Sequence, residues 1–201
     1  MSLLMNLKIN ENSVAAMLDL AMFSNQLADK SKRNIEREGF NFVLNNLIEN
    51  SSQLLAYTDS GKPYLKGRKE HISLSHSHDK LVVVLNNIES TGVDIELIRD
   101  KVLLVRHKFL SEEELNSLSE LDVEKNLVYW AAKETLYKIQ GKKGVNFTTD
   151  LFIWDFDYNT NGGVIRGNIL NNESCNTYAL KYSKQQEYIL VYMLNEICNN
   201  L

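Results

Sequence analysis

Two carboxylates stand two positions apart in the short apolar segment GVDIEL, residues 92–97. In a strand, side chains two apart share a face, so Asp94 and Glu96 are predicted to point the same way and the apolar residues around them the other way. Like charges set side by side repel each other, and burying an unpaired charge is costly. The pattern therefore predicts a bound cation, or a pair of basic side chains, next to these two carboxylates.

A third carboxylate lies in the segment YWAAKETLYK, residues 129–138. Trp130, Glu134 and Lys138 are spaced by four, which places them along one face of a helix. Such a helix presents a carboxylate and an ammonium group together. The alternative interpretation is an ordinary surface ion pair between Glu134 and Lys138, which contributes little to stability.

Two more segments precede these in the chain, GKPYL at 61–65 and ISLSHS at 72–77. In this order the segments resemble the motifs of the 4'-phosphopantetheinyl transferase superfamily, which is marked by G-[IV]-D-x-E and, further on, W-[SCT]-x-K-E-x-x-x-K. The upstream segments are similar to the G-K-P and S-H-S elements of that family, and FLSEEEL from Phe109 is similar to the part between its two signatures. Ala131 departs from the pattern, since Ser, Cys or Thr usually holds that place.

The resemblance implies a transferase that moves the phosphopantetheine arm of coenzyme A onto a serine of an apo acyl or peptidyl carrier protein and releases 3',5'-ADP. It implies Mg²⁺, with Mn²⁺ as a possible substitute, and coenzyme A as co-substrate. The presence of both motif halves in one chain resembles the surfactin-synthetase-activating type, a monomer with an internal pseudo-twofold. The implied fold is α+β with two similar halves: 1–97 with the coenzyme A phosphate elements and the first metal carboxylates, and 98–201 with the WxxKExxxK helix.

The roles of the acidic residues and of Lys138 follow by matching position. Asp94, Glu96 and Glu134 are the implied metal ligands, and Lys138 is expected to stabilise or protonate the leaving phosphate. The proton of the serine needs an acceptor, either Glu114 or the metal-bound Glu134. Glu114 has an equally good alternative role, because it stands three places after Ser111, where a capping-box glutamate stands.

Four basic residues are implied in coenzyme A binding. Lys62 and His76 match family residues that contact the phosphates of coenzyme A, and Lys133 is expected to help hold the nucleotide or phosphate groups. Arg33 lies in a basic helical segment expected to grip the 3'-phosphate. An exposed polar turn is the alternative interpretation of His76.

The elements that must position these residues can be read from periodicity. Apolar residues recur at intervals of three and four from residue 12 to about 50, which predicts helix and includes the stretch SVAAMLDLAMF. A second helix is predicted from near Asp122 to Gln140, with Gly141 as its stop. Alternating runs predict strands at HISLS, KLVVVL, GVDIEL, LFIWDF, GVIRGNIL, TYALKYS and EYILVYML.

Composition narrows the class of protein. The chain has 201 residues, 44% hydrophobic and 24% charged, which is typical of a globular protein with a substantial core. Its two cysteines, Cys175 and Cys198, form no CxxC pair, which favours a reducing cytoplasm. The stretch SVAAMLDLAMF is too short to span a membrane and lacks the features of a secretion signal. A net charge of −4 argues against a general nucleic-acid binder.

The carrier proteins of this system are acidic, and so is this chain, so recognition is expected at a local patch. We expect that patch near the start of the second half, around Arg106, Lys108 and Phe109. Two other functions compete with transfer: a non-catalytic coenzyme A-binding relative of the same fold, and a metal-dependent phosphoesterase that uses the same three carboxylates. The second leaves Lys138 and the GKP and SHS segments unexplained.

Overall fold

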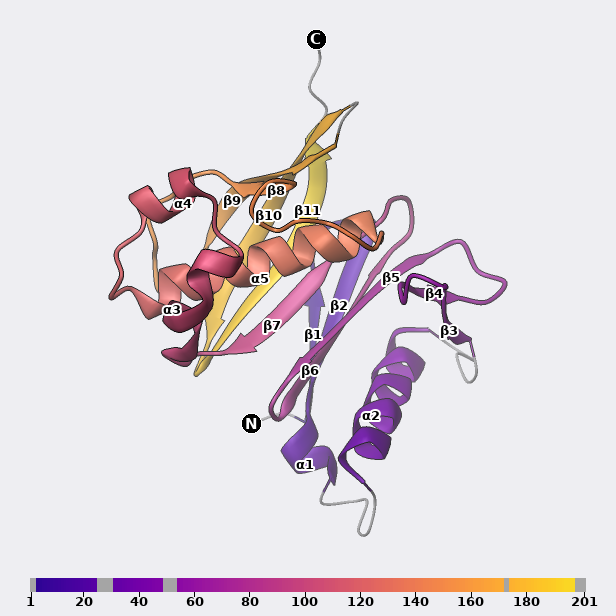
Figure 1. Cartoon of the computed structure of the whole chain (residues 1–201). Coiled ribbons are helices and arrows are strands. Elements are labelled where there is room, and N and C mark those ends of the chain that lie inside the picture. The colour runs from indigo at the N-terminus through magenta and orange to yellow at the C-terminus, as the bar shows by residue number, and fades with distance from the viewer. Residues whose placement is uncertain (1–2, 25–30, 49–53, 172–173, 198–201) are drawn as a thin grey trace.

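Two antiparallel sheets carry the fold of this chain in a computed structural model, which describes residues 3–24, 31–48, 54–171 and 174–197 (Figure 1). Cys198, named in the sequence analysis, lies outside these ranges. The first sheet has the strand order β1-β2-β6-β5. Its strands are β1 (Leu4–Lys8), β2 (Ser13–Asp19), β5 (His71–Ser77) and β6 (Lys80–Asn86).

The second sheet has the order β7-β11-β10-β9-β8. Its strands are β7 (Val93–Leu97), β8 (Leu151–Ile153), β9 (Gly163–Leu170), β10 (Cys175–Gln185) and β11 (Tyr188–Ile197). A separate two-stranded ribbon pairs β3 (Leu55–Tyr57) with β4 (Pro63–Leu65). Every strand pair in both sheets is antiparallel, in agreement with the alternating runs of the sequence.

Six helical segments complete the described chain. They are α1 (Leu20–Ser24), α2 (Lys32–Leu47), α3 (Lys101–Val105), the 3-10 turn η1 (Arg106–Lys108), α4 (Glu112–Ser117) and α5 (Val123–Gln140). No helix among the described residues is long and apolar enough to cross a membrane.

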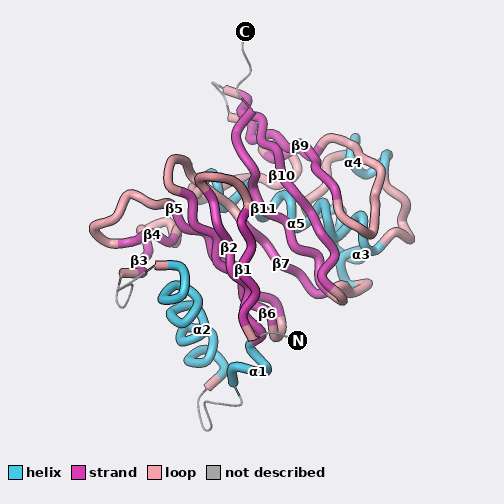
Figure 2. Tube along the Cα trace, turned by 180° about the vertical axis from the view of Figure 1, so that it is seen from behind, coloured by secondary structure: helices cyan, strands magenta, loops and turns pink. Residues whose placement is uncertain are grey.

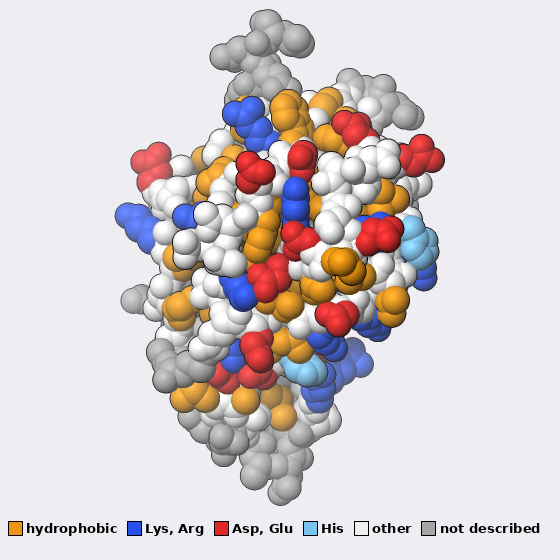
Figure 3. Space-filling model, turned by 90° about the vertical axis from the view of Figure 1, so that its left-hand side faces the viewer, with side chains coloured by type: hydrophobic (Ala, Val, Ile, Leu, Met, Phe, Trp, Pro, Cys, Tyr) orange, Lys and Arg blue, Asp and Glu red, His pale blue; other side chains and the backbone are white. Residues whose placement is uncertain are grey.

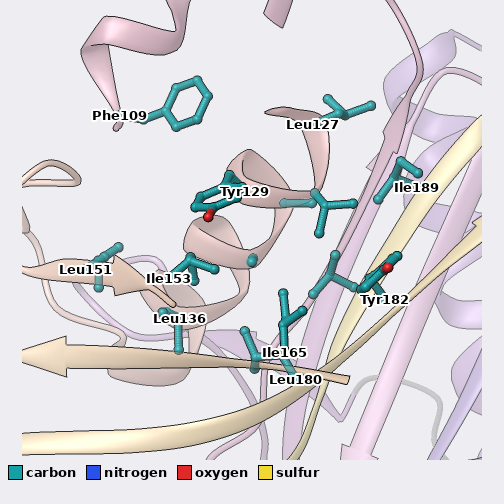
Figure 4. Packing of buried hydrophobic residues seen from close by; sticks show 14 of the residues in the cluster. Phe109, Leu127, Tyr129, Leu136, Leu151, Ile153, Ile165, Leu180, Tyr182 and Ile189 are labelled. Carbon is teal, nitrogen blue, oxygen red and sulfur yellow. The ribbon is translucent and has the colours of Figure 1, made fainter. Parts of the chain in front are cut away.

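The layers follow from three groups of buried residues. The first joins α2 to one face of the first sheet, through residues such as Val43 and Leu81. The second lies between the two sheets and includes Val84 and Leu190. The third joins α5 to the outer face of the second sheet (Figure 4). The order of layers is therefore α2, first sheet, second sheet, α5, and Figure 2 shows α2 against the first sheet and α5 beside the second.

Helix α5 begins and ends where the sequence predicts. The side chain of Asp122 caps its N-terminus by accepting a hydrogen bond from the Lys125 amide, 2.9 Å away. Gly141 ends it with φ 67°, a left-handed conformation that glycine adopts without steric cost. At the start of β7, a Cβ on Gly92 would lie 2.3 Å from the carbonyl oxygen of Thr135, so only glycine lets β7 approach α5 this closely.

Two predictions about the elements need correction. Residues 13–19 form a strand, β2, and not part of a helix, because β1 and β6 flank this short apolar run on both sides. Periodicity alone does not separate a short buried strand from a helix. Strand β7, which we assigned to the first half of the chain, is an edge strand of the second sheet, paired with β11.

Candidate active site

Strand β7 separates its charged and apolar side chains as the sequence predicts. Val93 and Ile95 are fully buried between the two sheets. Asp94 and Glu96 lie on the other face of the strand, where they contact α5. Asp94 is itself buried, so its charge depends on the partners it finds there.

Helix α5 supplies one partner to each of these carboxylates, from the predicted face. The indole nitrogen of Trp130 donates to Oε1 of Glu96 at 2.8 Å. Lys138 Nζ donates to Oδ1 of Asp94 at 2.7 Å and to the carbonyl oxygen of Val93 at 2.9 Å. Lys138 therefore binds across to β7, which argues against an isolated surface pair with its helix neighbour.

The third carboxylate, Glu134, lies between these two contacts on the same helix face. Burial and the negative charges of Asp94 and Glu96 together raise its pKa to about 7, against the opposing effect of the nearby Lys138. Burial, followed by repulsion from Asp94, also raises the pKa of Glu96. Three acids thus share a region that holds one ammonium group, and a cation there would relieve their repulsion.

Two serines of β5 also reach these carboxylates. Ser75 Oγ donates to Oδ1 of Asp94 at 2.7 Å, and Ser77 Oγ donates to Oε2 of Glu96 at 3.0 Å. Neither serine was predicted from the sequence to have a role of its own. The spacing of the serines in SLSHS could have predicted that they lie on one face, since side chains two apart share a face of a strand.

A cavity of about 360 Å³ opens beside Lys138 and gathers several of the predicted binding residues. Lys62, His76 and Lys138 line it, together with Phe40 and Tyr57. The ammonium of Lys62 is anchored by Ser90 Oγ at 2.7 Å and by the carbonyl oxygen of Ile139 at 2.8 Å. Burial lowers the pKa of Lys62.

A second hollow adjoins this cavity, and Phe40 and Tyr57 line both. Arg33 and Arg37 of α2 line the second hollow. His76 Nε2 lies 3.4 Å from Oε1 of Glu36, which also lines it. The shared lining residues place Arg33 and Arg37 of α2 next to the cavity that Lys62 and Lys138 line.

Residues 90–193 match the family model of the 4'-phosphopantetheinyl transferase superfamily. The chain belongs to this superfamily. The matched region contains β7 and all of α5, and so the three carboxylates and Lys138. No curated protein matches the chain.

Glu114 and Lys133 lie in segments that resemble the motifs of this superfamily. In the structure, both residues make buried contacts that hold the fold together. The capping box at α4 is complete: Ser111 Oγ accepts from the amide of Glu114, and Glu114 Oε2 accepts from the amide of Ser111 at 2.8 Å. The other oxygen of Glu114 accepts from the amide of Ile153 at 2.8 Å. With 1% of its surface exposed, Glu114 is not placed to receive a proton from a carrier serine.

The role expected for Lys133, which was to help hold the nucleotide or phosphate groups, also needs correction. Its side chain has no exposed surface, and its ammonium donates to Glu114 Oε2 at 2.6 Å and to the carbonyl oxygens of Phe109 and Phe147 at 2.7 and 2.8 Å. These three bonds use all three protons of the ammonium group. Lys133 therefore joins α5 to the loops around α4 and does not face a nucleotide.

The oxygen atoms at β7 fit a hard divalent cation. Oδ2 of Asp94 is buried and finds no hydrogen-bond partner among the described residues, so it has a free lone pair next to Glu96. Among those residues, no three His, Cys, Asp or Glu side chains already form a group that could hold a metal ion. Mg²⁺ commonly binds through one or two carboxylates and completes its shell with phosphate oxygens and water, which suits this arrangement.

Proposed function

We propose that this protein transfers the 4'-phosphopantetheine arm of coenzyme A to a serine of an apo carrier protein and releases 3',5'-ADP. The observation that carries the proposal is the meeting of Asp94, Glu96, Glu134 and Lys138 at the edge of the cavity that Lys62 and His76 line. This cavity has cationic groups for a polyanion and ends at the carboxylates. A hydrolase would need no such basic extension toward α2.

The proposed ligands of the metal are Asp94 and Glu96 from β7 and Glu134 from α5. When bound, Mg²⁺ would neutralise negative charge on the pyrophosphate and favour attack by an oxygen nucleophile. The carrier serine oxygen attacks the phosphorus on the pantetheine side, and the bond from this phosphorus to the bridging oxygen breaks. The ADP moiety leaves with that oxygen.

The residues of α5 divide the remaining tasks. Lys138, now paired with Asp94, stabilises the charge that develops on the leaving phosphate. Glu134 accepts the proton of the carrier serine, directly or through a water.

We also propose the surfactin-synthetase-activating type, a monomer with two halves related by a pseudo-twofold, acting in the cytoplasm. The candidate site supports it, since one chain supplies both the cavity, from the first sheet and α2, and the carboxylates, from β7 and α5. Lys62, His76 and Arg33 are the proposed contacts for coenzyme A phosphates.

The test is intact-protein mass spectrometry of apo acyl and peptidyl carrier proteins incubated with the protein, coenzyme A and Mg²⁺. We expect a gain of one phosphopantetheine group, lost on chelation and in Glu134→Gln. Glu113→Gln, the same change at an exposed residue of α4, is the matched control and should retain transfer. Hydrolysis of coenzyme A without carrier would indicate a phosphoesterase instead, and binding of coenzyme A without transfer to any carrier would indicate a non-catalytic relative.

A further inference from the structure

The two sheets meet along β5 and β7 through side chains and not through a backbone ladder. The hydroxyl oxygens of Ser73, Ser75 and Ser77 accept hydrogen bonds from the amides of Val93, Ile95 and Leu97, at 3.1, 3.3 and 3.2 Å. Each amide lies 20 residues after its serine, so the two strands run in the same direction. Three serine hydroxyls thus take the place of the carbonyl acceptors that a neighbouring strand would supply.

Two of the three hydroxyls have a second task. While it accepts from β7, Ser75 donates to Asp94, and Ser77 donates to Glu96. A hydroxyl can do both because it carries one proton and two lone pairs. Within the described part of the chain, Ser73 makes the amide contact but reaches neither carboxylate, which makes it a natural comparison for the other two.

Each carboxylate is consequently held from two directions. Asp94 Oδ1 accepts from both Ser75 and Lys138, which leaves Oδ2 as the oxygen without a partner among the described residues. Glu96 is held between Ser77 on β5 and Trp130 on α5. A carboxylate fixed in this way loses less rotamer freedom when it binds a cation than a carboxylate that is free to turn.

We propose that Ser75 and Ser77 are positioning residues that hold Asp94 and Glu96 in the orientation needed to bind the divalent cation. The inference rests on the proposed function, because it assumes that these two carboxylates bind the metal. It assigns to the serines on either side of His76 a role separate from the coenzyme A contact expected of the histidine. Ser75 and His76 both line the cavity, so strand β5 would connect the metal carboxylates with the proposed coenzyme A pocket.

The experiment measures binding of Mn²⁺, as free Mn²⁺ by electron paramagnetic resonance, in the presence of coenzyme A and against a blank without protein. Ser75→Ala and Ser77→Ala should each weaken Mn²⁺ binding by about 10- to 100-fold, as is usual when a partner of a metal ligand is removed, whereas Ser73→Ala should stay within about twofold of the unaltered protein. Thermal unfolding should show a loss of stability in all three variants, since each leaves one amide of β7 without its acceptor.

The outcomes separate a positioning role from a structural one. If all three alanine variants lose stability but bind Mn²⁺ with the same affinity as one another, the serines only join the sheets and the inference is overturned. If the unaltered protein binds no Mn²⁺, the metal part of the proposed function fails and the inference fails with it. Should an alanine variant not fold, the cysteine variants at positions 73, 75 and 77 carry the same expectation, because a thiol is a weak donor of similar size.

Discussion

Lys138 and Asp94 form an ion pair between α5 and β7, with 2.7 Å between Nζ and Oδ1. The carboxylate of Asp94 is nearly inaccessible to solvent, whereas a quarter of the lysine side chain is exposed to the cavity. The ammonium can therefore balance the buried charge from the side on which a pyrophosphate would arrive. This geometry makes Lys138 both a stabilising partner of Asp94 and a cation that lines the cavity proposed for coenzyme A.

Replacing Lys138 by methionine should affect catalysis more than coenzyme A binding. Removing one electrostatic stabiliser of a transition state usually lowers kcat by about 10²- to 10³-fold, and we expect that range here with a smaller change in KM for coenzyme A. Steady-state transfer to an apo carrier measures both constants. Lys142→Met, at an exposed lysine beyond the end of α5, is the control. A kcat equal to that of the control would remove Lys138 from the mechanism.

The pKa of Glu134 predicts how stability depends on pH without added metal. The group titrates at about 7 in the folded protein and at its ordinary value of 4.5 when unfolded, so the folded state holds the extra proton between these values. The free energy of unfolding should then fall as pH rises through this window, by at most about 3 kcal/mol. Urea unfolding at a series of pH values measures it.

Glu134→Gln is the comparison for this pH series. The amide does not titrate, so the fall attributable to position 134 should disappear, and Mg²⁺ should restore stability to the unaltered protein near neutral pH by relieving repulsion among the carboxylates. Parallel pH curves for the two proteins would contradict the raised pKa.

The buried pair of Lys133 and Glu114 should contribute to the stability of the fold and not to the affinity for coenzyme A. Lys133→Met leaves a carboxylate buried without its ammonium partner, and breaking such a pair costs about 3–5 kcal/mol. The soluble, folded fraction should nevertheless bind coenzyme A with nearly unchanged affinity, as isothermal titration calorimetry would show. The double variant Lys133→Met with Glu114→Leu should recover part of the stability. A large loss of coenzyme A affinity at normal stability would return Lys133 to the binding site.

The contrast between Lys133 and Lys138 shows what the sequence could predict. Spacing by four placed Trp130, Glu134 and Lys138 on one helix face, and this was confirmed because the period of a helix fixes which residues share a face. Lys133 belongs to the same motif, but it lies about 100° around the helix from Glu134, on the side that packs into the core. A motif gives residue types at positions, whereas their surroundings come from the tertiary structure.

The same limit explains the other corrections. The alternating strands, the capping box at Ser111 and the glycine stop at Gly141 depend on local chemistry, and they were predicted. The strand Ser13–Asp19 was missed because its identity depends on distant neighbours, β1 and β6. The contacts of Ser75 and Ser77 depend on β7 approaching from the other sheet, which no local pattern reveals.

The docking surface for an acidic carrier should lie closer to Glu96 than we expected from the sequence. Phe109 is buried and Arg106 pairs with Glu120 at 2.7 Å, so of the three expected residues Lys108 alone remains an exposed, unpaired candidate for this patch among the contacts described. A hollow next to Glu96 is instead lined by Arg99 and Lys101, which are exposed. Figure 3 views the side of the molecule with α3 and α4, and acidic and basic side chains are interspersed over much of it, so attraction must be local.

Charge reversal tests this position directly. The double variant Arg99→Glu with Lys101→Glu should raise KM for the carrier by about tenfold or more, most strongly at low salt, and leave KM for coenzyme A unchanged. The double variant Arg106→Glu with Lys108→Glu, which reverses the same amount of charge farther along the chain, is the matched control and should have the smaller effect. Equal effects of the two double variants would indicate general steering by net charge, and a larger effect of the second would place the carrier over η1, as the sequence first suggested.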